Sequence, residues 1–290
     1  LGPEADPDAR TQYALDFAHP EVRQYRMQFI KELAQKDIDG IELDFMRFWI
    51  IFHPFRTTSQ ERADIITNFV KEVRAEFDKH AKSGQRRYIC VRIPAYRDVM
   101  DKMGVDPVRL ATEAGVDMFN VSGHYWSNLQ NEAAQIKKSL PDNVAVYTEQ
   151  HFTNAKQNYK VPMGSEDGQG VLYENSGNVP ANAKISWVFR RTTDQALITA
   201  AHMAYARGVD GLSFFNFQYY RSTRNPTDVF GKNHEPPYYI FKYLRDPAYV
   251  SKQDQYYFIG LTHNEPARDN RPFQNVFVTE VPQTQWLDMA

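Results

Sequence analysis

The sequence holds a single cysteine and lacks the features that mark several large classes of protein. With Cys90 alone there is no intrachain disulfide and no thiol-rich metal site, and its setting "YICVRI" predicts a packed core thiol. No apolar run reaches the ~18 residues of a membrane span. No signal peptide is visible, and the chain opens without Met in the loop-like "LGPEADPDAR". We therefore expect a processed or truncated piece, whose compartment the sequence alone does not fix.

An excess of charge of one sign is also missing. The 34 Lys and Arg residues nearly balance the 36 Asp and Glu residues, and no basic block forms a stripe, which argues against a nucleic-acid partner. Neither G-x-G-x-x-G after a strand nor G-x-x-x-x-G-K-[ST] occurs, so nucleotide-binding folds lose their main support and we expect no cofactor. Aromatic residues are frequent, at 14%, which hints at a surface that stacks on flat ligands.

Helix and strand patterns alternate along the chain. Apolar residues at helical spacing and capping signals predict helices over 20–36, 60–82, 106–115, 128–139, 193–207 and 236–245. Strands are predicted over 38–46, 87–93, 116–126, 143–150 and 209–220, with a possible sixth at 11–17. Such alternation is typical of parallel βαβ units, either in an open doubly wound sheet or in a (β/α)8 barrel.

Three of the predicted strands begin alike, with "IDGIELDF", "VDMFNVSG" and "VDGLSFFN". Each follows a helix end and starts with a β-branched residue and Asp. This is a weak internal repeat of helix–turn–strand units.

Two acids, Glu42 and Asp44, interrupt the apolar strand in "DIDGIELDFMRFW". A buried ionised carboxylate costs several kcal/mol unless it is paired or solvated. Side chains alternate across a strand, so both acids lie on the face opposite Ile41 and Leu43. If helices cover the apolar face, the acids point inward, and Asp44 lies at the carboxyl end, where barrel active sites are built. The alternative is a structural network in which Arg47 or Arg92 holds the acids.

The other strands also turn polar or aromatic at their carboxyl ends, which favours a binding cleft there. The polar residues are Arg92, Asn120, Ser122, His124, Tyr147, Glu149, Asn216 and Gln218. The aromatic residues that can stack on sugar rings are Trp49, Tyr125, Trp126, Tyr219 and Tyr220. With Arg47, they make up the predicted substrate-binding surface.

Glu149 is the one further acid at such a strand end. Acids at two strand ends suit glycosidic hydrolysis, in which one protonates the leaving oxygen and the other attacks the sugar or activates water. A metal site built from Asp44, Glu149, His124 and His151 is the rival use, but no close ligand spacing supports it and we expect no metal.

Residues 15–48, "LDFAHPEVRQYRMQFIKELAQKDIDGIELDFMRF", resemble the glycosyl-hydrolase-like family 10 proteins, bacterial (β/α)8-barrel enzymes, in the segment from "NP-x-VR" to "VDGI-x-LD". His19 stands where that pattern has Asn. The matching residues are Pro20, Val22, Arg23, Asp39, Gly40, Ile41, Leu43 and Asp44. The resemblance implies that the 38–46 strand is the fourth of a barrel whose first strands are lacking in this chain, and that Glu149 ends the seventh.

The resemblance also implies a function. It implies a secreted or periplasmic glycoside hydrolase domain over 1–250, acting on a polysaccharide or cell-envelope glycan. Apart from the resemblance, the patterns "QYYFIGL" and "NVFVTEV" predict a β-rich extension over 251–290. The strand-four acid would be the acid/base and Glu149 the nucleophile of a retaining reaction. Acids after strands four and seven are the arrangement of the large retaining glycosidase clan, which has an Asn-Glu pair at strand four. This sequence lacks that pair. The acid can therefore be Asp44 or Glu42, and Asp44 can instead be the nucleophile. The rivals are a non-catalytic carbohydrate-binding barrel and a metal-dependent hydrolase or aldolase-type barrel.

Overall fold

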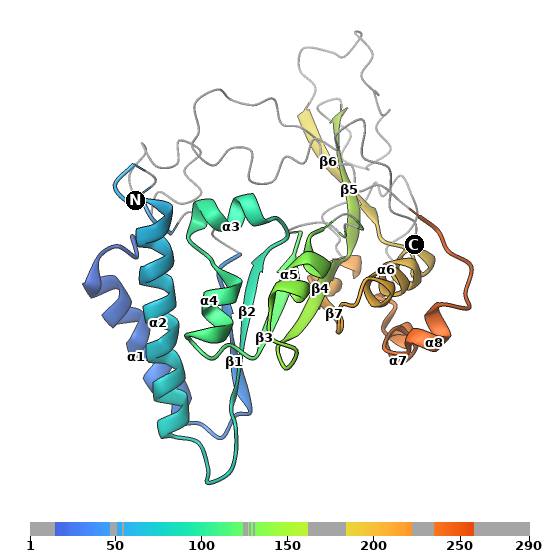
Figure 1. Cartoon of the computed structure of the whole chain (residues 1–290). Helices are drawn as coiled ribbons and strands as arrows, with labels where there is room; N and C mark the ends of the chain where they lie inside the picture. Colours follow the sequence, from blue (N-terminus) through green and yellow to red (C-terminus); the bar gives the residue numbers. More distant parts are fainter. Residues whose placement is uncertain are drawn as a thin grey trace.

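The computed structural model describes residues 15–46, 51–53, 55–123, 127, 129, 131–161, 184–221 and 235–257. Within these residues the chain forms an α/β fold, with a five-stranded parallel sheet and a separate two-stranded antiparallel ribbon (Figure 1).

The helices and strands follow one another along the chain as numbered in Figure 1. The helices are α1 (Pro20–Ala34), α2 (Ser59–Lys79), α3 (Arg97–Met103), α4 (Pro107–Thr112), α5 (Ala133–Ser139), α6 (Asp194–Ala206), α7 (Phe241–Leu244) and α8 (Pro247–Val250). The strands are β1 (Gly40–Asp44), β2 (Tyr88–Pro94), β3 (Met118–Ser122), β4 (Ala145–His151), β5 (Thr153–Val161), β6 (Lys184–Arg191) and β7 (Gly211–Phe215). Two 3-10 helices, η1 (Phe217–Arg221) and η2 (Tyr238–Ile240), complete the described elements.

The strands of the large sheet lie in the order β1-β2-β3-β4-β7, and every neighbouring pair is parallel. The order never reverses. Because βαβ crossovers are right-handed, steady progress in one direction places the connecting helices on one face of the sheet. Side chains on that face, among them Leu43, Val91 and Phe119, join Phe69 and Val73 of α2 in one apolar core. The sheet is therefore apolar on its helix-covered face.

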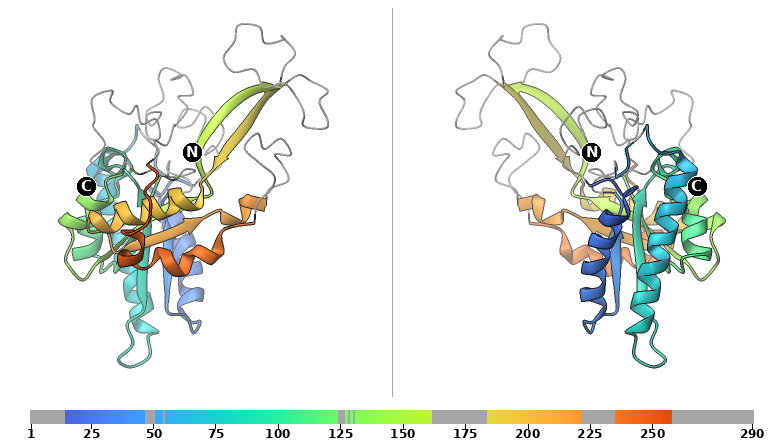
Figure 2. Two further views of the ribbon diagram at one scale, coloured as in Figure 1. Left: turned by 90° about the vertical axis from the view of Figure 1, so that its right-hand side faces the viewer. Right: turned by 90° about the vertical axis from the view of Figure 1, so that its left-hand side faces the viewer.

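The ribbon β5–β6 leaves the sheet directly after β4. It projects well beyond the carboxyl ends of the parallel strands (Figure 2). The sequence analysis assigned no structure to this segment, although Ile185, Trp187 and Phe189 of β6 alternate as in a strand.

The prediction of five alternating strands is confirmed, with differences at several boundaries. The predicted strand at 209–220 is too long: Asn216 takes a left-handed φ of 57°, which ends β7 at Phe215, and η1 follows. Helix α5 begins at Ala133, five residues later than predicted, and α3 was not predicted. Residues 15–17 of the possible sixth strand are not in a strand, and 11–14 lie outside the described residues.

The barrel and the domain division were not settled by these elements. Within the described residues the sheet is open, with β1 and β7 at its edges. Residues 251–257 of the predicted β-rich extension form no strand, and 258–290 lie outside the described part of the chain. The division at residue 250 stays a prediction.

The repeated aspartate at the strand starts joins neighbouring strands. The main chain of Asp117 donates to Ile89 O, while its carboxylate accepts from Ile89 N at 2.8 Å. Asp210 makes the same two bonds with Val146, the carboxylate again at 2.8 Å from the amide nitrogen. Each aspartate therefore fixes the register of its strand against the preceding one.

Asp117 also holds two arginines. Its carboxylate lies 2.6 Å from Nη2 of Arg74 and 2.5 Å from Nε of Arg86, and the side chains of Asp117 and Arg74 are only 11% and 10% exposed. Because Arg74 belongs to α2, its ion pair with Asp117 connects the helix layer to the start of β3.

We expect Asp117→Ala to lower the free energy of unfolding by about 3–5 kcal/mol, because it leaves Arg74 buried without its main counter-charge. Urea unfolding of the full chain measures the loss. Asp78→Ala is the matched control: Asp78 contacts the same arginine at 3.0 Å, but its side chain is 53% exposed, so its loss is expected below about 1 kcal/mol. Equal losses in the two variants would contradict the role given to Asp117.

Candidate functional site

The face of the sheet away from the helix-covered core is lined by polar side chains. The register aligns them across the strands: Glu42 is opposite Cys90, and Asp44 is opposite Arg92. By strand parity this face includes Glu42, Asp44, Cys90, Arg92, Asn120, Ser122, Tyr147, Glu149, Ser213 and Phe215. We call this set the polar face.

Arg92 lies at the centre of the polar face and joins the acids of two strands. Its Nε donates to Oε2 of Glu149 at 2.6 Å and its Nη2 to Oε1 at 2.8 Å, so the Glu149 contact is bidentate. Its Nη1 lies 3.0 and 3.2 Å from the two carboxylate oxygens of Asp44. Asp44 on β1 and Glu149 on β4 therefore meet on one guanidinium at the carboxyl ends of their strands.

The surroundings of Arg92 hold its guanidinium in place. Ser122 accepts from Nη2 at 2.9 Å and donates to Oε1 of Glu149 at 2.6 Å. The ring of Phe215 lies beneath the guanidinium, 4.2 Å from Cζ to the ring centroid, a cation–π contact. The pKa of Arg92 is raised: burial acts to lower it, but the hydrogen bonds and charges of Glu149 and Asp44 outweigh that effect.

The two acids differ in their access to solvent. The side chain of Glu149 is 2% exposed, whereas that of Asp44 is 36% exposed. The single positive charge of Arg92 is shared by the carboxyl groups of Asp44 and Glu149, and Glu149 is the one that is buried. Burial raises the pKa of Glu149, and hydrogen bonds from Arg92 and Ser122 oppose the shift without reversing it. The site thus pairs a carboxylate open to solvent with a buried carboxyl whose proton is held more tightly.

A second polar group lies one layer nearer the amino ends of the strands. Oε2 of Glu42 accepts from Sγ of Cys90 and Nδ2 of Asn120, both at 3.3 Å, and Ser213 donates to Oδ1 of Asn120 at 2.5 Å. Glu42 is exposed, as is Asp44. The prediction that Cys90 packs in the apolar core is wrong, because its strand parity turns it to the polar face. Burial and the charge of Glu42 raise the pKa of Cys90, which disfavours a nucleophilic thiolate.

The carboxyl end of β7 is arranged differently from the prediction. Asn216 and Gln218 do not end the strand on the inward face; the register Glu149↔Ser213 shows that Ser213 and Phe215 do. Asn216 instead lies 3.4 Å from Nε2 of the buried His151 through its Nδ2, and Gln218 is exposed.

The two adjoining tyrosines of η1 have different environments. Tyr219 is 46% exposed and packs edge-to-face on Phe152, at 5.6 Å between ring centroids. Tyr220 is buried, and its hydroxyl donates to Thr192 O at 2.6 Å. Tyr219 therefore keeps a face open to a ligand, while the prediction of Tyr220 as a stacking surface is wrong.

The remaining predicted residues lie outside the described part of the chain. They are Arg47, Trp49, His124, Tyr125 and Trp126. Among the residues that are described, no three His, Cys, Asp or Glu side chains gather where they could hold a metal ion. No described helix combines the length and apolarity needed to cross a membrane.

The sequence analysis missed two residues that support Arg92 and the lower layer. Phe215 and Ser213 belong to the polar face, but the last strand was assigned the opposite parity through Asn216 and Gln218. Gly211 lies against Tyr147, since a Cβ added to it would be 2.3 Å from the Tyr147 ring. Ser213 and Phe215 are two and four residues further on, so they lie on the same face of β7 as Gly211.

Comparison with known proteins adds no assignment. The chain matches no protein-family model and no curated protein.

The raised pKa of Glu149 predicts a pH dependence of stability. The folded chain holds this proton more tightly than the unfolded chain, whose glutamates titrate at about pH 4.3. Its stabilising contribution is therefore complete below about pH 4.3 and is lost as the pH rises through the raised pKa. Glu149→Gln has no such proton, so the wild-type free energy of unfolding minus that of the variant is expected to fall with rising pH.

Urea unfolding of both proteins at a series of pH values checks this. Groups that do not interact with Glu149 cancel in the difference. A difference that stays constant or grows with pH would show that Glu149 is not harder to ionise in the folded chain.

Proposed function

We propose that this chain is a glycoside hydrolase domain that cleaves O-glycosyl bonds of a polysaccharide or cell-envelope glycan. The observation that carries the proposal is the meeting of Asp44 and Glu149 on Arg92, at the carboxyl ends of two parallel strands. Carboxyl groups from two strand ends, in different environments, are what glycosidic hydrolysis requires. The resemblance of residues 15–48 to glycosyl-hydrolase-like family 10 proteins points the same way.

The fold proposal that accompanies this function is a (β/α)8 barrel, with β1 as its fourth strand. The unreversed strand order and a polar face opposite the helices support it, because a barrel has this order and turns one face inward. The outer edge of α1 supports it too. Tyr25, Phe29 and Leu33, four residues apart, are 42–48% exposed and form an apolar stripe suited to a neighbouring helix.

The repeated aspartate gives independent support. Asp117 and Asp210 each accept an amide N–H from the preceding strand of the sheet. Asp39 occupies the same position at the start of β1 and is exposed, so its carboxylate is available to a further strand beside β1.

Asp44 is the carboxylate that we assign to the attack on the sugar. Its side chain is open to solvent, and its orientation is fixed by Nη1 of Arg92 and by the amide of Met46, at 2.8 Å from Oδ1. In the retaining route Asp44 forms a bond to the anomeric carbon while the bond to the leaving oxygen breaks. Water then attacks the same carbon and releases Asp44.

Glu149 is the group that we assign to the proton. Its raised pKa suits a carboxyl that donates a proton to the leaving oxygen and takes one from the incoming water. This assignment reverses the roles that the family resemblance implies, in which Glu149 is the nucleophile and the strand-four acid is the acid/base. The reason is that Asp44 is the acid open to solvent, at 36% exposed against 2% for Glu149.

A non-catalytic carbohydrate-binding barrel is the second candidate, and one observation favours it. The bidentate Arg92–Glu149 pair has the geometry of a structural ion pair, closed to solvent. Screening the full chain against a polysaccharide panel separates the two functions. Binding of a glycan without release of reducing sugar would favour the binding barrel over the hydrolase.

We expect Asp44→Gly to lower the turnover of the active polysaccharide by about 10³-fold or more, because the attacking group is removed. Adding azide, a small external nucleophile, is expected to restore turnover and to give a glycosyl azide of inverted configuration. The melting temperature should stay close to that of the wild type, since Asp44 is partly exposed.

Asp98→Gly is the matched control, because Asp98 is a 68% exposed aspartate on α3, away from the polar face. It is expected to retain full turnover. Retained turnover in Asp44→Gly would remove Asp44 from the reaction, and unrescued loss with a collapsed melting temperature would make it a structural residue.

A further inference from the structure

The hydroxyl of Ser122 lies between the guanidinium of Arg92 and the carboxyl group of Glu149. Ser122 ends β3, the strand that runs between the strand of Arg92 and the strand of Glu149. It is fully buried, and its Oγ is 2.9 Å from Nη2 of Arg92 and 2.6 Å from Oε1 of Glu149. This hydroxyl therefore has one neighbour that always donates and one whose role depends on whether it carries a proton.

Arg92 suits only the ionised form of Glu149. A guanidinium has N–H donors and no acceptor, so its bonds to Oε1 and Oε2 fit a carboxylate. When Glu149 is protonated, as its part in the proposed reaction requires, its new O–H group is a buried donor. A buried donor without an acceptor is costly, so the neutral form needs a partner other than Arg92.

Among the described contacts of Glu149, Ser122 is the one that can accept this proton. A hydroxyl has one proton and two lone pairs, and the proton turns to suit its neighbours. Ser122 accepts from Nη2 of Arg92 with one lone pair, and the other can accept from Oε1 of Glu149. At Oε2 the described partner is Nε of Arg92, which cannot accept. The 2.6 Å between Oγ and Oε1 fits a strong O–H···O bond in either direction.

We propose that Ser122 is the positioning residue for the proton of Glu149, and that Oε1 is the oxygen that carries this proton. The serine hydroxyl donates to Oε1 when Glu149 is ionised and accepts from Oε1 when Glu149 is protonated. The inference deepens the proposed function and rests on it for the use of the proton. In that reaction the proton passes from Oε1 to the leaving oxygen, and Oε1 later takes one from the attacking water.

The bond from Ser122 also affects how tightly the proton is held. The charges that act on Glu149 are those of Arg92, which lowers its pKa, and Asp44, which raises it. A hydrogen bond to an ionised carboxylate is stronger than one to a neutral carboxyl group. Loss of the serine hydroxyl therefore destabilises the ionised form more than the neutral form, and raises the pKa of Glu149.

Carbon-13 NMR of the full chain, labelled at the side-chain carboxyl carbon of glutamate, tests the proposal. Glu149→Gln removes one signal and so assigns it. We expect Ser122→Ala to raise the pKa of Glu149 by about one pH unit, or about tenfold tighter proton binding, because the lost bond is charge-assisted. Ser122→Thr keeps the hydroxyl and is expected to keep the wild-type pKa.

Ser213→Ala is the matched control. Its hydroxyl lies on the same face of the sheet but donates to Asn120, so its loss is expected to leave the pKa of Glu149 unchanged. If Ser122→Ala does not fold, the near-isosteric Ser122→Cys, a weaker donor, is expected to raise this pKa by a smaller amount. A pKa that stays the same or falls in the Ala or Cys variant, or rises equally in Ser122→Thr, would overturn the proposal.

The NMR titration measures the proton and not turnover, so it separates this inference from the proposed function. A raised pKa in Ser122→Ala, in a chain that releases no reducing sugar from any polysaccharide, would remove the hydrolase and support the role of Ser122. Turnover of a polysaccharide with an unmoved pKa in Ser122→Ala would overturn the role of Ser122 and leave the hydrolase in place.

Discussion

The arrangement of the polar face depends on one guanidinium group, that of Arg92. Arg92 is almost fully buried, and every nitrogen of its side chain bonds to Asp44, Glu149 or Ser122. These partners come from β1, β3 and β4, so a single side chain on β2 ties together four of the five parallel strands. A buried cation in this position needs a buried counter-charge, so the loss of Glu149 would cost more than the loss of the partly exposed Asp44. The geometry of the acids is thus set by Arg92 and not by the strands alone.

The one-sided sheet is what makes such a cluster possible. With the core residues on the helix-covered face, the opposite face can carry two layers of polar side chains without weakening the apolar core. The upper layer joins Asp44, Arg92 and Glu149, and the lower layer joins Glu42, Cys90 and Asn120. The hydrogen bonds described above each join members of one layer.

Much of this could be predicted from the sequence, for physical reasons that individual residues show. The alternation of Ile41, Glu42, Leu43 and Asp44 predicts which face is polar, because strand parity is fixed. Phe215, which contacts Arg92, and Ser213, which contacts Asn120, were not predicted. Arg92 itself was predicted only as a rim residue or a structural partner, since its reach across β3 to Glu149 depends on register. The parity of β7 was assigned wrongly because a left-handed Asn216 ends the strand, which no spacing rule indicates.

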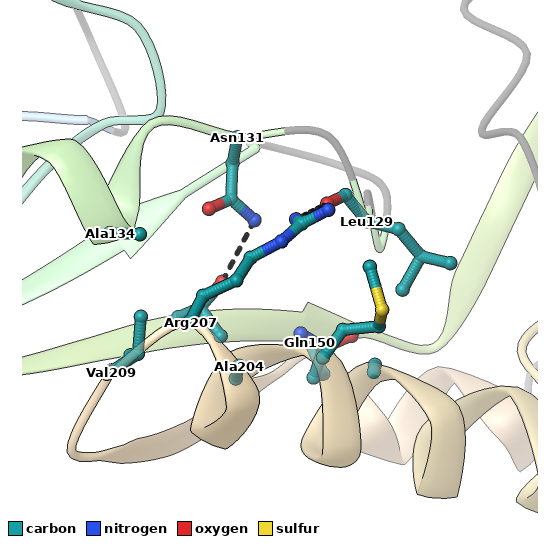
Figure 3. Close-up of a pocket in the computed structure, with 10 residues that line it drawn as sticks. Leu129, Asn131, Ala134, Gln150, Ala204, Arg207 and Val209 are labelled. Atoms are coloured by element: carbon teal, nitrogen blue, oxygen red, sulfur yellow. Dashed lines mark hydrogen bonds between the residues drawn. The ribbon is translucent and has the colours of Figure 1, made fainter. Parts of the chain in front are cut away.

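The ribbon β5–β6 was not predicted from the sequence. Its strands belong to a long, mainly polar stretch of sequence, and the alternating Ile185, Trp187 and Phe189 of β6 are a short signal within it. A small cavity between β4 and α6 was equally hidden, because it depends on how Thr148 and Gln150 pack against the helix (Figure 3).

The sequential strand order has a consequence for how the molecule opens. Four of the five strands contact their immediate chain neighbours in the sheet, so β1 with α1 can detach at one edge without disturbing pairs farther along. Amide protection should then rise from the edges toward β2 and β3, as in a stacked array of small cooperative units. Arg92 opposes this, because its bonds to β1 and β4 couple the loss of the edge strand to the interior. The strand that bears Asp44 is therefore expected to exchange more slowly than its place at the edge of the described sheet alone would give.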